Sequence, residues 1–354
     1  MKRRGFLVAG RRAVGLTACV LAVACAGRSP VSALPSVLAQ IRHLHPQAAQ
    51  NLYVLNQSAR NYYGSITVYK PGRSAPLRTL VGTSNPIAMA FDSAENLYVV
   101  DYITNAVLVY PPGAIKPKYR FSDGVKQPIS IAIDASNDIY VGNLGGPPSV
   151  TVYAASSRKL LKTLVNCVNW PGSLATDDSG NLYVANGGVG DAGPFSVCVF
   201  GTSGTRAITD GIYDPFALAL DAAGNLYVAD FDNRVTVYPP GASTPSATLG
   251  SANGISQPWA LAVDPSGNLY VANDGNNTVT SYAATTLDPL LTITDGISNP
   301  FSLAFGSYGF LNVANLGPNS KSPGWVTQYA PGKVTYGRRI TKGVDSPTQV
   351  AFGP

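Results

Sequence analysis

Histidine is almost absent from this sequence, with only His43 and His45, both near the N-terminus. The rest of the chain offers no imidazole as a general base or zinc ligand, which excludes enzymes whose site is built on histidine. Charged residues are also scarce, at 12% of the chain. A disordered protein is excluded as well, because 45% hydrophobic residues is too many for a chain that cannot bury a core.

No apolar run is long enough to form a membrane-spanning helix. The run from Ala13 to Ala24 follows the basic start Lys2-Arg3-Arg4, and this order is typical of a secretory signal peptide. Arg3-Arg4-Gly5-Phe6-Leu7 also resembles the twin-arginine export signal. Five of the 25 basic residues lie in this segment, so the formal charge of +6 predicts no nucleic-acid partner for the mature chain.

We expect residues 1–26 to be the signal peptide, residues 27–50 a linker and residues 51–354 a single folded domain. Cys25 follows Ala22-Val23-Ala24 and is similar to the cysteine that is lipidated in bacterial lipoproteins. The alternative is plain cleavage near Ala26 without a lipid. We therefore expect an exported protein that is periplasmic, extracellular or attached to the cell envelope by an N-terminal lipid alone.

The mature chain keeps two cysteines, Cys167 and Cys198. An oxidising compartment would allow them to form a disulfide. Two isolated buried thiols are the alternative. Their spacing does not match any metal-binding motif.

The sequence is rich in a repeat of 42 to 45 residues. Its most constant phrase is Asn-Leu-Tyr-Val, at Asn51, Asn96, Asn181, Asn225 and Asn268, with weaker copies at Asp138 and Phe310. Each unit also holds short alternating segments bounded by Pro, Gly and Asn, which is the pattern of strands and turns. A period of this length fits one four-stranded antiparallel blade, so the repeat predicts an all-β, seven-bladed β-propeller.

The first predicted strand of each unit begins with Pro, and the fourth residue after that Pro is always Ala, as in Ala90 and Ala262. A small side chain at one fixed position is expected where blades converge on a central axis. The last segment, Pro347–Phe352, is a first strand with no blade after it, whereas the unit at Asn51 lacks a first strand of this type. We therefore predict that the C-terminal strand joins the N-terminal blade and closes the ring.

The combined pattern Pro-x-x-apolar-Ala-x-Asp-x-x-Gly-Asn-Leu-Tyr-Val resembles the NHL repeat over residues 51–354. The resemblance implies a propeller, and its members include binding and scaffold modules, sensor ectodomains, lactonases and lyases. The lactonase type would use a divalent cation such as calcium, held by a Glu, Asn and Asp set. Glu95 is the only glutamate and occupies a turn position, so that set is not reproduced.

Two rings of polar residues recur in the units. The first comprises aspartates at the ends of first strands, and we interpret it as turn chemistry, because each precedes an Asp-x-x-Gly-Asn turn. The second follows the Tyr-Val strand and should lie at the opposite rim: Asn56, Asp101, Asn143, Asn186, Asp230, Asn273 and Asn315. Turn chemistry explains this ring too, but Asp101 and Asp230 are also candidate cation ligands.

Three aromatic residues, Phe216, Trp259 and Phe301, directly follow the blade-opening Pro in three consecutive units. They should cluster at the channel mouth, beside Asn186, Asp230 and Asn273 as hydrogen-bonding groups. Packing over the channel is the alternative role. We expect a monomeric, non-catalytic binding or scaffold propeller without a cofactor, whose ligand is a protein, peptide or glycan. The alternative is a metal-dependent hydrolase or lyase of the lactonase type.

Overall fold

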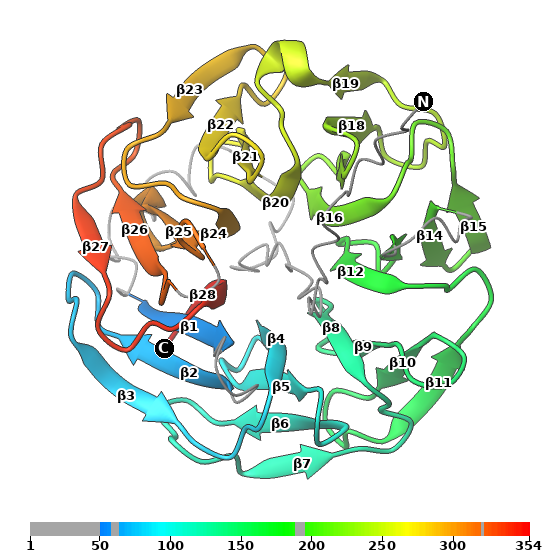
Figure 1. Cartoon of the computed structure of the whole chain (residues 1–354). Coiled ribbons are helices and arrows are strands. Elements are labelled where there is room, and N and C mark those ends of the chain that lie inside the picture. Colours follow the sequence, from blue (N-terminus) through cyan, green and yellow to red (C-terminus); the bar gives the residue numbers. More distant parts are fainter. Residues whose placement is uncertain (1–49, 58–63, 188–194, 320–321) are drawn as a thin grey trace, which may run out of the picture.

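The computed structural model describes residues 50–57, 64–187, 195–319 and 322–354. They form seven four-stranded antiparallel sheets arranged in a ring (Figure 1). The predicted all-β, seven-bladed propeller is therefore confirmed. The predicted signal peptide with Cys25, and the linker up to residue 49, lie outside the described residues.

In each of blades 1 to 6 the strands follow one another in chain order from the central axis outwards. Blade 1 contains β4 (Pro86–Phe91), β5 (Leu97–Asp101), β6 (Ala106–Tyr110) and β7 (Tyr119–Phe121). Blade 2 contains β8 (Pro128–Ile133), β9 (Ile139–Asn143), β10 (Ser149–Tyr153) and β11 (Leu160–Leu164). Blade 3 contains β12 (Pro171–Thr176), β13 (Leu182–Asn186), β14 (Ser196–Gly201) and β15 (Gly204–Ile208).

The next three blades repeat this order. Blade 4 contains β16 (Pro215–Leu220), β17 (Leu226–Asp230), β18 (Arg234–Tyr238) and β19 (Ala247–Leu249). Blade 5 contains β20 (Pro258–Val263), β21 (Leu269–Asn273), β22 (Thr278–Tyr282) and β23 (Pro289–Ile293). Blade 6 contains β24 (Pro300–Phe305), β25 (Leu311–Asn315), β26 (Trp325–Tyr329) and β27 (Arg338–Ile340). Two short 3-10 turns, η1 (Ser251–Asn253) and η2 (Ser307–Gly309), lie between strands.

Blade 7 joins the two ends of the domain. It consists of the C-terminal strand β28 (Pro347–Gly353) followed outwards by β1 (Asn51–Gln57), β2 (Gly64–Tyr69) and β3 (Pro76–Leu80). Strand β28 pairs antiparallel with β1, with Ala351 opposite Tyr53. The predicted closure is confirmed, and the pairing removes the open edges that an unclosed ring would expose.

The alanine that recurs in every first strand lies where neighbouring blades meet. First strands of adjacent blades contact one another around the axis, as β4 does with β8 and β20 with β24. All seven of these alanines are buried, and Ala90 stands opposite Tyr98 of the second strand. The small residue therefore occupies the narrow inner part of the blade, and the large tyrosine fills the space further along the same face.

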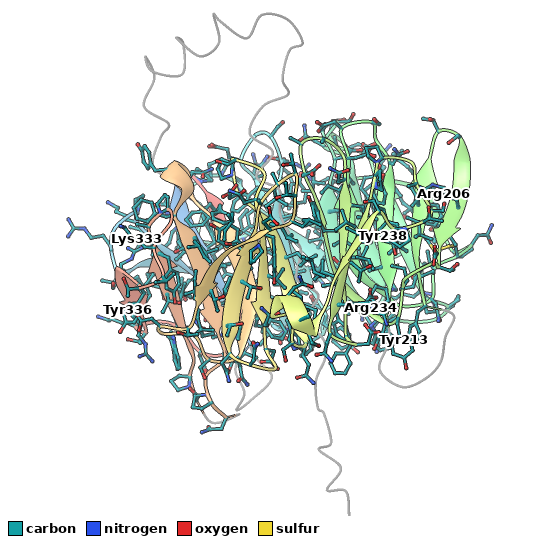
Figure 2. All side chains as sticks on the ribbon, turned by 90° about the horizontal axis from the view of Figure 1, so that it is seen from above. Arg206, Tyr213, Arg234, Tyr238, Lys333 and Tyr336 are labelled. Carbon is teal, nitrogen blue, oxygen red and sulfur yellow. A yellow bond between two sulfur atoms is a disulfide. The ribbon has the colours of Figure 1, made fainter. Side chains whose placement is uncertain are left out.

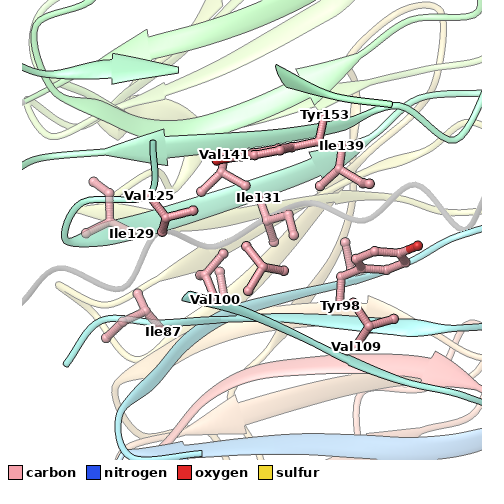
Figure 3. Close-up of a cluster of buried hydrophobic side chains, with 13 residues drawn as sticks. Ile87, Tyr98, Val100, Val109, Val125, Ile129, Ile131, Ile139, Val141 and Tyr153 are labelled. Atoms are coloured by element: carbon pink, nitrogen blue, oxygen red, sulfur yellow. The ribbon is translucent and has the colours of Figure 1, made fainter. Parts of the chain in front are cut away.

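The core consists of apolar layers between adjacent blades. The layer between blades 1 and 2 contains Ile87, Val100, Ile131, Val141 and other fully buried side chains (Figure 3). These side chains come from strands of both blades and pack face to face. Each blade thus buries its apolar faces against its neighbours, as expected of a repeat architecture.

In six of the seven blades a tyrosine at the end of the third strand fixes the linker by which the chain enters the blade. In blade 2 the Tyr153 hydroxyl donates to the carbonyl oxygen of Asp123, at 2.6 Å. Blades 1, 4, 5, 6 and 7 make the same bond, from Tyr110, Tyr238, Tyr282, Tyr329 and Tyr69. We call this contact the tyrosine latch. Burial raises the pKa of Tyr153 to about 12, so the latch hydroxyl stays protonated at physiological pH.

No helix in the described part of the chain has the length and apolar character needed to cross a membrane.

Candidate functional site

We name the face of the ring on which the seven first strands begin the proline rim, and the face with the Asp-x-x-Gly-Asn turns the turn rim. The aromatic residues predicted from the sequence meet on the proline rim. The ring centroids of Phe216 and Trp259 are 4.8 Å apart, and those of Trp259 and Phe301 are 5.0 Å apart in a stacked arrangement. Centroid separations of this size are typical of attractive aromatic pairs.

A fourth ring extends this cluster. Phe231 lies 5.5 Å from Phe216 between centroids and is 42% exposed. We call Phe231, Phe216, Trp259 and Phe301 together the aromatic stripe. It crosses blades 4, 5 and 6, and its other three members are half-buried. At its far end Phe301 also packs against the apolar layer between blades 1 and 2.

Local structure explains how Phe231 reaches the stripe. A bulge follows Pro215 in the pairing of β16 with β17, so that Pro215 stands opposite Asp230, at the end of β17. Phe216 and Phe231 are the residues that directly follow these two partners. The sequence analysis missed Phe231, although its signal was present: an aromatic residue comes directly after the Asn or Asp position of this unit.

Polar and charged groups adjoin the Phe231 end of the stripe. Asp232 and Arg234 form an ion pair there, and the Arg234 side chain is 40% exposed. Figure 2 places Arg234 and Tyr213 close to the same edge of the molecule, and Tyr213 is 52% exposed. An apolar surface bordered by both charges and by a phenol can bind a ligand with apolar and hydrogen-bonding groups.

The predicted hydrogen-bonding residues of this rim do not reach its surface. Asn186, Asp230 and Asn273 are 2%, 0% and 0% exposed. The Oδ1 atom of each accepts a backbone N–H from the linker that enters its own blade, from Asn169, Tyr213 and Ser256 respectively. Their placement at an exposed channel mouth was therefore wrong. They hold the incoming linker rather than a local turn, because each accepted N–H lies 17 residues earlier in the chain.

The same contact holds the linker in other blades. Asn56, Asn143 and Asn315 each accept one N–H from the incoming linker. Asn143 also donates from Nδ2 to the Val141 carbonyl and to the Thr151 hydroxyl, both at 3.0 Å. The ring of amides is therefore a structural element that works beside the tyrosine latch.

The two carboxylates in this ring, Asp101 and Asp230, are occupied by the protein's own donors. Asp101 accepts the backbone N–H groups of Ser84, Asn85 and Thr104 and the Thr104 hydroxyl. These donors present partial positive charge, which opposes cation binding at the same oxygens. Asp101 belongs to blade 1 and Asp230 to blade 4, and each contacts its own linker, so they do not converge on a shared site.

Asp230 has an unusual environment because it is fully buried at a position where five other blades carry Asn. Burial is the main cause that raises the pKa of this carboxyl well above its ordinary value, and nearby Asp232 adds to the effect. The backbone N–H of Tyr213 and the hydroxyl of Thr236, at 3.0 and 3.4 Å, oppose it by donating to the carboxylate. The Nδ2 donor of the other blades is lost here.

The aspartates that end first strands cap turns, as the sequence analysis proposed. Asp177 Oδ1 accepts the backbone N–H groups of Ser179 and Asn181. Its Oδ2 accepts from Asn181 Nδ2 and from the Tyr183 hydroxyl, at 2.7 and 3.0 Å. Asp221 makes the same set of bonds in blade 4. Within the described ranges no three His, Cys, Asp or Glu residues gather in a way that could hold a metal ion.

The structure pairs Cys167 with Cys198 in a disulfide, with the two Cα atoms 6.0 Å apart. In five other blades a Gly stands at the position of Cys167 and faces a Thr at the position of Cys198. In blade 2, for example, a Cβ added to Gly124 would lie 3.0 Å from Thr151 Cγ2. Cysteines at both positions therefore bring their sulfur atoms within bonding reach. The alternative of two isolated thiols was wrong.

Blade 3 is also the blade without a tyrosine latch. Phe200 pairs with Leu182 in the register in which Tyr238 pairs with Leu226. Phe200 has no hydroxyl to donate, and the disulfide ties the incoming linker at Cys167 to β14 instead. The sequence contained this signal as three coordinated departures from the repeat, at Cys167, Cys198 and Phe200.

No protein-family model and no curated protein matches this sequence. Solved structures do share its fold. A functionally unknown protein from Desulfotomaculum acetoxidans DSM 771 superposes with a TM-score of 0.70 at 13% identity, over 86% of this chain and 99% of that one. U3-55K has a TM-score of 0.64 at 15% identity, over 76% of this chain and 89% of that one. The RRP9 WD40 repeats reach 0.63 at 16% identity, over 76% and 88%. At these identities the likeness establishes the seven-bladed propeller fold.

Proposed function

We propose that this protein is an exported, non-catalytic propeller of the NHL type that binds a protein or peptide on its proline rim. The observation that supports this best is the aromatic stripe. Phe231, Phe216, Trp259 and Phe301 form a continuous, partly exposed row of rings across three blades. Aromatic side chains of this kind are the commonest anchors of protein interfaces, because they bury a large area at a low cost in side-chain entropy.

The character of the surroundings supports a peptide as the ligand. The Asp232–Arg234 pair and Tyr213 lie beside the Phe231 end and can bond to a peptide backbone or a polar side chain. A rigid scaffold also favours binding, since first strands locked around a closed ring hold the rings in place before the ligand arrives. The fold of the WD40 repeats is consistent with a scaffold of this type.

The disulfide supports export. Cys167 has a φ of +70°, a conformation in which five of the other blades use Gly at the matching position facing Thr. A non-glycine residue in this region carries strain. A cysteine here is useful to the fold when it is oxidised, and structural disulfides persist in oxidising compartments. The twin-arginine-like start and Cys25 agree with a protein of the cell envelope.

The test is selection of binders from a random peptide library displayed on phage, followed by affinity measurement with synthetic peptides. We expect Trp259→Ala to weaken binding of the selected peptides at least tenfold, because truncation of a central aromatic anchor costs about 2 kcal/mol or more. Tyr308→Asn is the matched control, since Tyr308 is 60% exposed on the turn rim and Asn tolerates its φ of +65°. The proposal fails if Trp259→Ala folds normally and binds every selected peptide as tightly as the wild type.

A further inference from the structure

Positive charge is concentrated on the outside of four adjacent blades. The segments that lead into and form their outer strands β27, β3, β7 and β11 cover residues 330–341, 70–81, 111–122 and 154–165, and none contains Asp or Glu. Each carries three basic residues: Lys333, Arg338 and Arg339; Lys70, Arg73 and Arg78; Lys116, Lys118 and Arg120; Arg158, Lys159 and Lys162. We call this surface the basic wall.

The rest of the circumference has almost no charge. The matching segments of blades 3, 4 and 5 contain only Arg206 and Asp288 as charged residues. Figure 1 shows why the difference matters, since β27, β3, β7 and β11 follow one another around the ring. Four segments that are far apart in the sequence therefore form one continuous basic surface. The net charge of the domain does not reveal this surface, because acidic residues elsewhere in the domain offset its positive charges in the sum.

The cationic groups of the wall are accessible and partly pre-oriented. Lys70, Lys116 and Lys162 are exposed. The guanidinium groups of Arg120 and Arg338 donate to backbone carbonyls, of Thr104 and Arg73, at 2.9 and 2.7 Å. Among the described residues no wall side chain forms an ion pair with a carboxylate; the ion pair Asp232–Arg234 lies in blade 4. The positive charges of the wall can therefore pair with the anionic groups of a bound ligand.

The shape of the wall selects a flexible partner. It follows the outside of four of the seven blades, and is therefore a convex surface that turns through more than half of the ring. A flat bilayer touches such a surface along one side only, whereas a flexible chain can follow it through all four blades. Several weak charge contacts along one chain then add up, which is the basis of polyelectrolyte binding.

The aromatic groups of the wall argue against a nucleic acid. Single-stranded nucleic acids bind by stacking their bases on open aromatic faces. Of the exposed tyrosines of the wall, Tyr119 in blade 1 lies under the Arg158 guanidinium, 4.0 Å from its ring centroid. Tyr336 is 37% exposed but belongs to blade 6, two blades away, so these rings do not form a row on which successive bases could stack. We propose that the basic wall binds a linear acidic polysaccharide, through its carboxylate or sulfate groups. This surface is separate from the aromatic stripe.

The test uses heparin and alginate as sulfated and carboxylated probes, with the purified protein at 50 and 150 mM NaCl. The variant Lys70→Gln/Lys116→Gln/Lys162→Gln removes three charges from blades 7, 1 and 2. Its matched control, Lys126→Gln/Arg206→Gln/Arg234→Gln, removes the same charge from positions off the wall. Duplex DNA, single-stranded DNA and anionic phospholipid vesicles serve as competing probes, and thermal unfolding verifies that both variants fold.

We expect the wild type to bind at least one polysaccharide with an affinity that falls steeply with salt. The wall variant should lose about tenfold in affinity at 150 mM NaCl, and the control less than twofold. Equal losses in both variants would overturn the proposal, because net charge rather than the wall would then determine binding. Absence of polysaccharide binding at 50 mM NaCl, or tighter binding of DNA or vesicles than of either polysaccharide, would also overturn it.

Discussion

The disulfide of blade 3 can be replaced by the device that the other blades use. The variant Cys167→Gly/Cys198→Thr restores their Gly–Thr pair but leaves the blade without a latch. The bridge closes a loop with a sequence separation of 31 residues. In the chain-entropy treatment, losing such a bridge costs about 4 kcal/mol of unfolding free energy. Gly at a positive φ returns about 1 kcal/mol, so we expect a net loss of about 3 kcal/mol.

Adding Phe200→Tyr should recover part of this loss. The new hydroxyl would reach the carbonyl of Asn166, the residue that corresponds to the latch acceptor Asp123 of blade 2. One restored hydrogen bond contributes about 1 kcal/mol. For a domain of roughly 300 residues, a loss of 3 kcal/mol lowers Tm by about 5 °C, and the tyrosine should restore about 1.5 °C.

The assay is thermal unfolding followed by circular dichroism, with and without a reductant. Reductant should lower the Tm of the wild type and leave that of the double and triple variants unchanged. The reasoning would be refuted by a double variant as stable as the oxidised wild type. It would also be refuted if Phe200→Tyr failed to stabilise the double variant, because blade 3 would then not need a latch.

Three further predictions concern the structural elements around the site. Because burial raises the pKa of Asp230, the stability from its protonated form is complete below its ordinary value of 3.8 and is lost as the pH rises through the raised value. Asp230→Asn regains a donor to Thr236, so it should raise the unfolding free energy by about 1–2 kcal/mol at pH 7 and by less towards pH 4. Asp101→Asn should lower the unfolding free energy. Urea unfolding of both variants at a series of pH values tests the two expectations. Tyr153→Phe should cost about 1 kcal/mol of unfolding free energy in urea at pH 8. The cost should shrink above pH 10, because the hydroxyl ionises in the unfolded chain near its ordinary pKa of 10.0 but in the folded protein only near a pKa of about 12. Ala219→Leu should overpack the axis and cost about 1–3 kcal/mol in the same assay, and an unchanged midpoint would contradict the axial role.

The fold could be predicted because its determinants are local and repeated. Each unit carries its own strand alternation, turn residues and axial alanine, so seven copies give seven independent signals for one architecture. The closure was predictable for the same reason: Pro347–Phe352 is a first strand without a blade, and Asn51 begins a blade without one. The aromatic cluster followed from equal positions in consecutive units, which a ring brings side by side.

The hydrogen-bonding part of the site could not be predicted in the same way. The position of Asn186 or Asn273 at a strand end is a local property, but its burial depends on the linker that folds over it. That linker enters the same blade but precedes its first strand, 17 residues before the amide that it contacts. Strand alternation does not predict which backbone N–H will donate to an amide oxygen. The sequence pattern therefore could not distinguish buried Asn and Asp side chains that hold the linker from exposed ones that could bind a ligand.

Sequence alone determined the class of this protein: an all-β ring of seven units, closed by its last strand, with three aromatic residues on one rim. Only the tertiary structure decided which side chains are exposed and which are buried. In the folded ring the polar residues at the ends of the second strands are buried, Cys167 pairs with Cys198, and four distant segments form one basic surface. The physical reason is that strand and turn preferences act over a few residues, whereas burial, disulfide pairing and the electrostatic field depend on which segments the closed ring brings together.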